Sequence, residues 1–316
     1  MPATRASSHG ANIVGWGSYL PPKVLTNHDL ERMVDTSDQW IVERSGIRER
    51  HVDGTTIEMS IAAGRAAIAS AGLRPSDIDA LVIATTTPDK QWGNAAAVQH
   101  ALDLRCGAYE INAACSGFVY SLVNAHGLIA MGADNVLVIG ADSLSKITDW
   151  TDRNTAVLFG DGAGAVVLQS CDGPGELLAW DLDADGSAGP ILWADVGGYI
   201  QMEGKEVFRR AVRIMVDSAT KVLEHAGVTG DDISLIVPHQ ANIRIIQAAC
   251  DRLGVDMERT AVVLDRTGNT SAASIPLALD DALSNGRVSP GDLVLLVGFG
   301  GGMTAASALL RWGPRS

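Results

Sequence analysis

The feature that most constrains the fold is a pair of short patterns that occur twice, in the same order. AGLRPSDIDALVIATTT begins at Ala71 and AGVTGDDISLIVPHQAN begins at Ala226, and each is typical of a helix end, an acidic turn and an apolar strand. GADNVLVIGA from Gly132 and PGDLVLLVGF from Pro290 form the second pair. The repeated order predicts a duplicated chain. Chance similarity is the alternative, because αβ turns use a small set of residues.

The four strands in these patterns are apolar throughout rather than alternating, which is typical of strands covered by helices on both faces. Helical spacing of apolar residues occurs in five stretches, 56–71, 116–131, 206–226, 241–253 and 273–285. We therefore predict an α/β fold of two βα-rich halves, residues 10–172 and 173–316, whose helices share a central layer. Residues 172–203 are rich in Gly, Asp and Trp, which indicates a connection or a covering loop.

Length, charge and cysteine content exclude several classes of function. The 316 residues suffice for a substantial core, and no run of about 18 apolar residues indicates a membrane span. The net charge of −13 argues against nucleic-acid binding, because phosphate groups require a basic surface. The first ten residues lack the apolar core of a secretory signal. The four cysteines form no C-x-x-C pair, so we predict a reduced, cytoplasmic protein without a metal site.

Cys115 is the first candidate for chemistry. It lies in EINAACSGFVYSLVNAHGLIA, where a strand that we expect to be buried leads into a helix beginning near Ser116. The unpaired N–H groups and the dipole at a helix N-terminus lower the pKa of a thiol and favour a nucleophilic thiolate. The small neighbours Ala113, Ala114 and Gly117 leave space for a substrate. From position alone, a buried structural cysteine is an equally good interpretation.

Three further segments carry polar or flexible residues; two of them follow predicted strands and one precedes a predicted helix. His239 follows Pro238 at a strand's carboxyl end, where open α/β sheets bind ligands, and Asn242 is placed to begin the next helix. Asn269 lies between a glycine and a threonine. Residues 300–302 are glycines that permit close backbone approach, but the lysine of a phosphate-binding P-loop is missing. Taken singly, a loop histidine and an ordinary turn are the simpler interpretations.

Taken together, six strings resemble β-ketoacyl-ACP synthase III, of the thiolase superfamily. In chain order they are TSDQWIVERSGIRERH, AACSGF, DGAGAVVL, VPHQANIRI, GNTSAASIPLAL and GFGGG. The resemblance extends from about Ile13 to Trp312, which is nearly the whole chain. It implies a thiolase-like, five-layered αβαβα fold built from two similar halves, and this agrees with the duplication in the sequence.

The resemblance implies a catalytic triad of Cys115, His239 and Asn269. Cys115 would take an acyl group from acyl-CoA. Malonyl-ACP would then lose CO2 and attack the acyl-cysteine, and the β-ketoacyl-ACP formed would initiate fatty acid biosynthesis. The backbone N–H groups of Cys115 and Gly301 would form the oxyanion hole, and Phe299 would be the aromatic ring beside the cysteine. The family needs no cofactor, since acyl-CoA and malonyl-ACP are substrates.

Binding positions are carried over from the family in the same way. CoA would bind at four residues, Trp40, Arg44, Arg153 and Asn242. Arg209 and Arg244 match positions that dock the acidic acyl carrier protein, and Arg213 lies one helical turn from Arg209. Trp92 matches a residue that closes the acyl pocket of the partner in a homodimer.

Departures from the family pattern also occur. Lys205 stands where many members have Asn, and Met303 stands where Phe is common. The segment 184–201, in the region that helps to cover the acyl pocket, matches poorly.

Several other functions stay open at this point. The same triad serves specialised condensing enzymes of polyketide or quinolone biosynthesis, and acyltransferases that act on alcohols or amines. A biosynthetic thiolase would need a second cysteine near the C-terminal glycines, and none of the four lies there. A non-catalytic partner subunit would usually lack the nucleophile. A thioesterase would release the acyl group to water.

Overall fold

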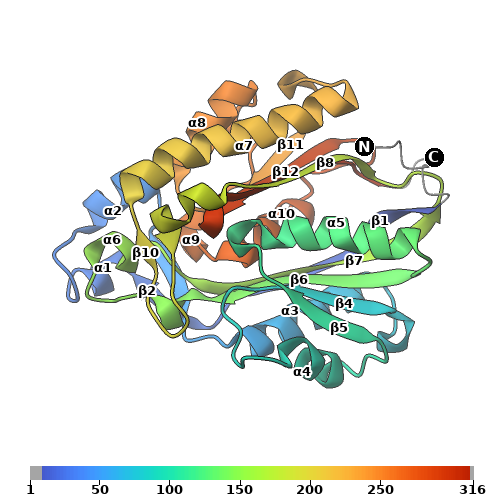
Figure 1. Cartoon of the computed structure of the whole chain (residues 1–316), viewed down its shortest axis with the longest axis horizontal. Helices are drawn as coiled ribbons and strands as arrows, with labels where there is room; N and C mark the ends of the chain where they lie inside the picture. Colours follow the sequence, from blue (N-terminus) through green and yellow to red (C-terminus); the bar gives the residue numbers. More distant parts are fainter. Residues whose placement is uncertain (1–8, 314–316) are drawn as a thin grey trace.

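The computed structural model describes residues 9–313, and two β-sheets alternate with three helical layers (Figure 1). The first sheet has the strand order β1-β7-β6-β4-β5. Strand β4 is parallel to β5 and β6, whereas β7 is antiparallel to β1 and β6. The bounds are β1 His9–Tyr19, β4 Ala80–Ala84, β5 Gly107–Ile111, β6 Asn135–Ser143 and β7 Asp161–Asp172.

The second sheet has the order β11-β12-β13-β8, in which only β11 and β12 are parallel. Its strands are β8 Leu177–Ala184, β11 Leu235–Pro238, β12 Leu293–Gly300 and β13 Thr304–Arg311. Read from the other end, β8-β13-β12-β11, this order repeats β1-β7-β6-β4 of the first sheet with the same parallel and antiparallel pairs. In place of a fifth strand, Thr260 forms an isolated parallel bridge with Ile236 of β11.

Two helices fill the layer between the sheets. α5 (Gly117–Ala130) contacts β4 and β6 on one side and β12 and β13 on the other, and α10 (Ser274–Ser284) contacts β6, β7 and β11. The outer layers consist of α3 (Thr56–Ser70) and α4 (Asn94–Ala101) on the first sheet and α7 (Gly204–Ala226) and α8 (Ile243–Leu253) on the second (Figure 1). Side-chain oxygens cap the N-termini of several helices. Thr55 Oγ1, for example, accepts a hydrogen bond from Glu58 N at the start of α3.

Shorter elements connect these layers. They are β2 Lys23–Thr26, α1 Asn27–Leu30, α2 Asp38–Ser45, β3 Glu49–Val52, α6 Arg153–Ala156, β9 Leu192–Trp193, β10 Gln201–Met202 and α9 Leu264–Thr267. Four short 3₁₀ helices contribute residues to the cavity described below, namely η2 Ala114–Ser116, η4 Gly186–Ile191, η7 Ser271–Ala273 and η8 Gly301–Met303. Within residues 9–313, none of the helices combines the length and the apolar character that crossing a membrane requires.

The predicted α/β class is confirmed, and the five predicted helices are present as α3, α5, α7, α8 and α10. β6, β11 and β12 are buried along their whole length. The prediction of a buried strand before Cys115 is wrong. β5 is the edge strand of its sheet and pairs with β4 alone, so its side chains stay partly exposed in the chain. A short apolar run does not distinguish an edge strand from a central one.

The prediction that residues 172–203 form only a connection or covering loop is also wrong in part. Its first half contains β8, which pairs with β13 along the edge of the second sheet. Acidic residues such as Asp181 and Asp183 alternate along β8, and an edge strand tolerates them because one face meets solvent.

Candidate active site

A cavity of about 1030 Å³ lies where residues from both sheets meet. Its wall includes Cys115, His239 and Asn269, the three residues that the sequence predicts to form a triad. They come from the turn before α5, the end of β11 and the turn before α10, so elements that lie far apart in the sequence supply them. The volume lies at the upper end of the range for small-molecule sites.

Cys115 sits on a tight turn between β5 and α5. Ala114, the residue before it, has a left-handed backbone with φ of 49°, which is strained for a side chain other than glycine. The turn packs on the glycine segment that begins at the end of β12, where a β-carbon at Gly300 would lie 2.5 Å from Cys115 N. The backbone of Cys115 is thus in direct contact with the segment that carries Gly301, the second predicted oxyanion donor.

The predicted low thiol pKa is wrong for this structure. Burial raises the pKa of the Cys115 thiol to about 12; the Ser271 hydroxyl, which is hydrogen-bonded to the thiol, opposes that rise, and the Asp142 carboxylate adds to it. Proximity to a helix N-terminus was the basis of the prediction. In the folded chain, loss of hydration and a nearby anion outweigh it, because both penalise the thiolate.

His239 is 1% exposed and stands directly after β11. Burial lowers the pKa of its imidazole to about 3, so the ring is neutral at physiological pH. Its Nδ1 lies 2.6 Å from Ser274 Oγ at the start of α10. A serine hydroxyl can donate to Nδ1, and the ring proton is then on Nε2, as a hydrogen-bond donor. The ring of Phe299 meets the His239 ring edge-on, with 5.2 Å between the centroids.

Asn269 is fixed through its backbone and its side chain. Its N–H donates to Leu158 O at 2.8 Å and its carbonyl accepts from Gly160 N at 2.9 Å. Its side-chain Oδ1 accepts from Ser271 N at 2.9 Å. Because Oδ1 is used inside the turn, the Nδ2 amide group is the part of Asn269 left to donate to a substrate.

Three of the four predicted CoA residues lie at another part of the wall, and Arg153, which is not part of the wall, contacts one of them. The guanidinium carbons of Arg44 and Arg153 lie 4.9 and 4.0 Å from the centroid of the Trp40 ring. Trp40 and Arg44 line the cavity. Asn242 also lines it, but its Oδ1 accepts from Arg244 N and its Nδ2 donates to Arg44 O, both at 2.9 Å. Asn242 therefore caps α8 and ties it to α2.

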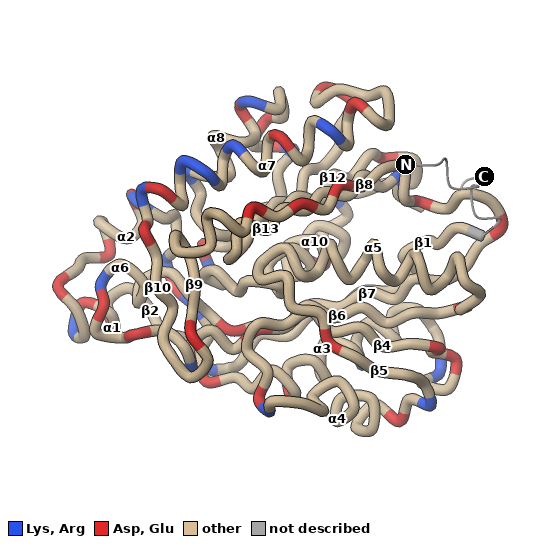
Figure 2. Tube along the Cα trace, in the orientation of Figure 1, with Lys and Arg blue, Asp and Glu red and all other residues tan. Residues whose placement is uncertain are grey.

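Lys and Arg residues recur along α7, where Figure 2 shows several blue segments of the Cα trace. Arg209 is bound to Glu206 through two hydrogen bonds of 2.6 and 3.0 Å. Arg213 and Arg244 are exposed and form no ion pair within residues 9–313. Arg244 lies on the cavity wall, with its guanidinium 5.6 Å from the Phe208 ring.

Two other predicted regions lie in different places. Trp92 is 75% exposed on the loop before α4 and is absent from the cavity wall of its own chain. The poorly matching segment forms part of that wall through Leu192, Trp193 and Ile200. Lys205, a departure from the family pattern, also lies on the wall. In residues 9–313, no group of three or more His, Cys, Asp or Glu side chains is placed to hold a metal ion.

Sequence reasoning missed three residues that shape the site, namely Ser271, Ser274 and Asp142. The two serines lie inside the GNTSAAS string, but nothing in their spacing indicates which one faces the thiol and which the imidazole. Asp142 had a signal. A carboxylate at the end of the apolar run NVLVIGA needs buried donors, because burial of a lone charge is costly.

Comparison with known proteins identifies the family of this chain. The family model described as 3-oxoacyl-[acyl-carrier-protein (ACP)] synthase III matches residues 109–186, and the model of its C-terminal part matches residues 223–312. The β-ketoacyl-[acyl-carrier-protein] synthase III of Geobacillus kaustophilus is 50% identical over 310 residues, which is 96% of this chain and 99% of that protein.

Solved structures extend the likeness to three dimensions. The 3-oxoacyl-[acyl-carrier-protein] synthase III of Aquifex aeolicus is 47% identical with a TM-score of 0.94, over 96% of this chain and all of that chain. A priming β-ketosynthase from the R1128 polyketide pathway is 36% identical with a TM-score of 0.91, over 99% of this chain and all of that one. The match in sequence and in fold leads to one assignment: this chain is a member of the 3-oxoacyl-[acyl-carrier-protein] synthase III family.

Proposed function

We propose that this chain initiates fatty acid biosynthesis by condensing an acyl-CoA primer with malonyl-ACP. The observation that carries the proposal is the single cavity that contains Cys115, His239 and Asn269 together with Trp40 and Arg44. A thiol, two neutral hydrogen-bond donors and a stacked aromatic–cation group are the functional groups that a two-step acyl transfer from CoA requires.

In the first step the sulfur of Cys115 attacks the thioester carbonyl of acyl-CoA. The new S–C bond replaces the bond from that carbon to the CoA sulfur, and the thiol proton passes to the departing CoA thiolate. The backbone N–H groups of Cys115 and Gly301 stabilise the tetrahedral oxyanion. Since one thioester replaces another, the acyl group keeps its reactivity.

In the second step malonyl-ACP loses CO2, and the electron pair of the broken C–C bond forms a thioester enolate. His239 Nε2–H and Asn269 Nδ2–H donate to the enolate oxygen. One pre-placed donor of this kind contributes about a hundredfold to a thousandfold in rate. The enolate carbon then attacks the acyl-cysteine, and Cys115 leaves as a thiolate that takes up a proton. Phe299, packed on His239, helps to keep water away from the acyl-enzyme.

CoA and the carrier protein use different parts of the surface in this proposal. The adenine and phosphate end of CoA lies at Trp40, Arg44 and Arg153. The acidic carrier docks on Arg213, Arg244 and Arg209, which offset the negative charge of this chain locally. Asn242 contributes to the CoA end through its cap on α8, which holds Arg44 in place. No cofactor takes part, and the reaction occurs in the cytoplasm.

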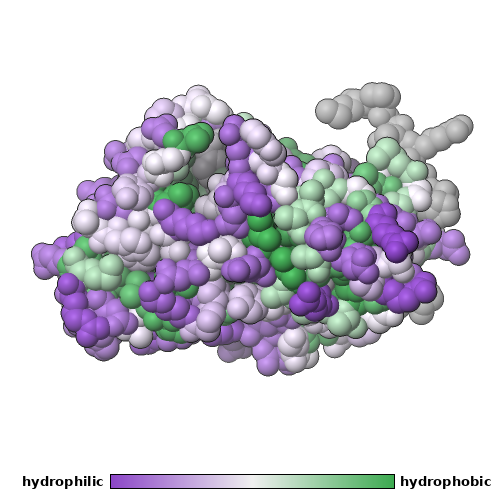
Figure 3. All heavy atoms as spheres, turned by 90° about the horizontal axis from the view of Figure 1, so that it is seen from below, coloured by the Kyte–Doolittle hydropathy of each residue, from purple (hydrophilic) through white to green (hydrophobic). Residues whose placement is uncertain are grey.

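A homodimer completes the proposal. β5 has an unpaired edge, and a second copy of the chain would cover it. Trp92 and Tyr109, at 75% and 38% exposure, would then be buried, and Trp92 would close the acyl pocket of the other copy. Figure 3, seen from below, shows apolar surface between the polar side chains of one face.

We also propose that the chain itself divides into two halves, residues 10–172 and 173–316.

Specialised priming of a polyketide is the second candidate, because a priming β-ketosynthase from such a pathway has the same fold at 36% identity. The fatty-acid role is favoured because the synthase III relatives are closer, at 47–50% identity.

The test is intact-protein mass spectrometry with a panel of acyl-CoAs, followed by malonyl-ACP. We expect Cys115 to gain one acyl group, and malonyl-ACP to remove it as β-ketoacyl-ACP forms. The Cys115→Ala variant should gain no mass; if it is acylated as fast as the wild type, the nucleophile assignment is wrong. An acyl group that malonyl-ACP leaves in place would move the function to another acceptor, and release without C–C bond formation would indicate a thioesterase.

A further inference from the structure

Asp142, at the carboxyl end of β6, is a buried carboxylate outside the predicted triad. It is 0% exposed, and within residues 9–313 it forms no ion pair with a basic side chain. A lone buried carboxylate is stable only where hydrogen-bond donors replace its hydration. Asp142 obtains these donors from two different parts of the molecule.

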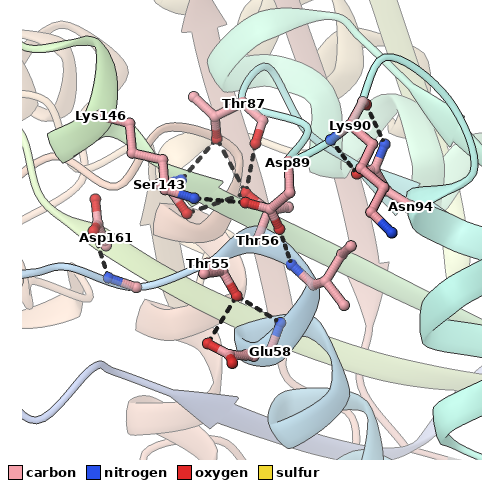
Figure 4. Close-up of polar contacts among 12 residues, drawn as sticks. Thr55, Thr56, Glu58, Thr87, Asp89, Lys90, Asn94, Ser143, Lys146 and Asp161 are labelled. Atoms are coloured by element: carbon pink, nitrogen blue, oxygen red, sulfur yellow. Dashed lines mark hydrogen bonds and ion pairs between the residues drawn. The ribbon is translucent and has the colours of Figure 1, made fainter.

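Oδ1 of Asp142 faces the segment that follows β4. It accepts from Thr86 N at 2.7 Å and Thr87 N at 3.1 Å, and from the hydroxyls of Thr85, Thr86 and Thr87 at 3.1, 2.9 and 2.8 Å. Figure 4 shows Thr87 at the centre of a network that includes Thr56 and Ser143. The donors on this side come from the first sheet and are themselves held in place.

Oδ2 of Asp142 faces the opposite way, toward the turn that carries Asn269. It accepts from Ala272 N at 3.0 Å. Two residues earlier on the same strand, Gly140 lies so close to this turn that an added β-carbon would overlap the Ala272 carbonyl oxygen. The turn therefore rests directly on β6, and one N–H donor fixes it to the carboxylate.

The turn holds two groups that face the reaction. Ser271 has a left-handed φ of 51°, a strained conformation that persists only when the surrounding structure supports it. Its N–H orients the Asn269 amide, and its hydroxyl is hydrogen-bonded to the Cys115 thiol. Release of Ala272 from Asp142 would allow Ser271 to relax, and the Asn269 amide would move with it.

We propose that Asp142 is a positioning residue for the decarboxylation step, because its carboxylate clamps the Asn269–Ala272 turn onto β6 and so fixes the donor amide of Asn269. The inference rests on the proposed function of this site. Asp142 acts through Asn269 and touches neither substrate.

Because the two oxygens of Asp142 accept from different segments, the substitution Asp142→Asn should break the contact with one segment and keep the other. Five donors surround Oδ1, so the amide oxygen of an asparagine would remain on the threonine side. Its NH2 group would then face Ala272 N–H, and two donors repel each other. The substitution keeps the shape of the side chain and breaks the one contact that clamps the turn.

The experiment measures the two half-reactions separately on the full-length protein. Single-turnover acylation by acyl-CoA is followed by mass spectrometry, and decarboxylation of malonyl-ACP by the acylated enzyme is followed by the loss of the acyl group. For Asp142→Asn we expect at least a tenfold slower decarboxylation, with acylation within about threefold of wild type. Acylation should change less because Cys115 and its oxyanion donors lie on other elements. Loss of the Asp142 charge also removes one of the causes that raise the pKa of the Cys115 thiol, so a change in acylation within this range should be an acceleration.

Glu176→Gln is the matched control. Glu176 is also a buried carboxylate, 1% exposed, and accepts from Ile13 N and Gly313 N, both at 3.0 Å. It lies between β7 and β8 and is absent from the wall of the active-site cavity. Burial raises the pKa of Glu176 to about 7, so the comparison is made at pH 8, where this carboxyl is mostly ionised. A general loss of stability on removing a buried charge would then occur in this variant as well, and we expect it to change both half-reactions equally or not at all.

The outcomes are distinct. If Asp142→Asn slows both half-reactions to the same extent, or slows neither, the positioning role is wrong while the proposed function stands. If the wild type acylates but does not decarboxylate malonyl-ACP, the proposed function itself fails.

A second measurement needs no variant and covers the case in which Asp142→Asn does not fold. Hydrogen exchange of the wild type should show the Ala272 amide protected at least a hundredfold relative to an open loop amide. Exchange at the rate of an open loop would overturn the clamp.

Discussion

The carboxyl ends of corresponding strands in the two sheets carry different chemistry. In the first sheet, β4 and β6 end in Thr85–Thr87 and Asp142, which use their polar groups on one another. In the second sheet, β11 and β12 end in His239 and Phe299, which face the cavity. The same αβ arrangement thus provides a hydrogen-bonded base in one sheet and the residues that we propose for the chemistry in the other. Cys115 lies between the two, in contact with Ser271 and in the field of Asp142.

The largest expected effect comes from removing the two side-chain donors that the second half of the chain supplies to the site. His239→Ala and Asn269→Ala should each slow decarboxylation of malonyl-ACP by about a hundredfold to a thousandfold, since each loses one pre-placed donor to the enolate. Acylation of Cys115 by acyl-CoA should continue. Separate single-turnover assays of the two steps provide the measurement. Normal condensation in both variants would remove these residues from the mechanism.

The effect of burial and of the Asp142 carboxylate on the pKa of Cys115 can be tested through the reactivity of the Cys115 thiol. With the pKa of Cys115 raised to about 12, the thiolate fraction increases tenfold for each pH unit throughout the stable range. Alkylation of Cys115 by iodoacetamide should therefore accelerate about a hundredfold from pH 7 to pH 9, without a plateau.

Cys115→Ala supplies the background from the other thiols in this alkylation experiment. A plateau near pH 7 would show that the N-terminus of α5 dominates over burial and Asp142. The prediction from sequence would then be right, and the contrast between the two sheets would be weaker than the structure indicates.

A substitution at the glycine that ends β12 tests how closely the second sheet packs against the turn that carries Cys115. Gly300→Ala should slow acylation roughly tenfold to a hundredfold, because the new β-carbon would lie 2.5 Å from Cys115 N and displace the oxyanion donors. Gly127→Ala, on α5 with open space around the glycine, is the control and should leave the acylation rate unchanged. Equal rates in all three proteins would show that the turn tolerates displacement.

The smallest effect is expected on the basic surface of the second half. Arg213→Ala and Arg244→Ala should lower kcat/KM for malonyl-ACP about threefold to tenfold, with a smaller change for acyl-CoA and a weaker dependence on salt. Arg209→Ala should have less effect, because Glu206 already binds that guanidinium. If acyl-CoA use falls as much as ACP use, these arginines act on a path that both substrates share.

Much of the site could be predicted because its residues occur in local strings. Cys115 before a helix, His239 after a strand and the Gly300 segment after another are each recognisable from neighbours in the chain, and the resemblance then links them. Trp40 and Arg44 are also local, one turn apart on α2. Arg153 is more than a hundred residues away, and its position over the Trp40 ring is a contact that only folding creates.

The sequence by itself determined the α/β class and the duplication, because apolar strands and helical spacing are properties of neighbouring residues, and its local strings supplied the candidates for the reacting groups through the family resemblance. Only the tertiary structure decided that β5 is an edge strand, that the pKa of Cys115 is raised and that Asp142 joins the threonine segment to the Asn269 turn. Edges, burial and buried hydrogen bonds depend on which distant segments pack together, and they set the free energies of charged and polar groups. No local pattern contains that information.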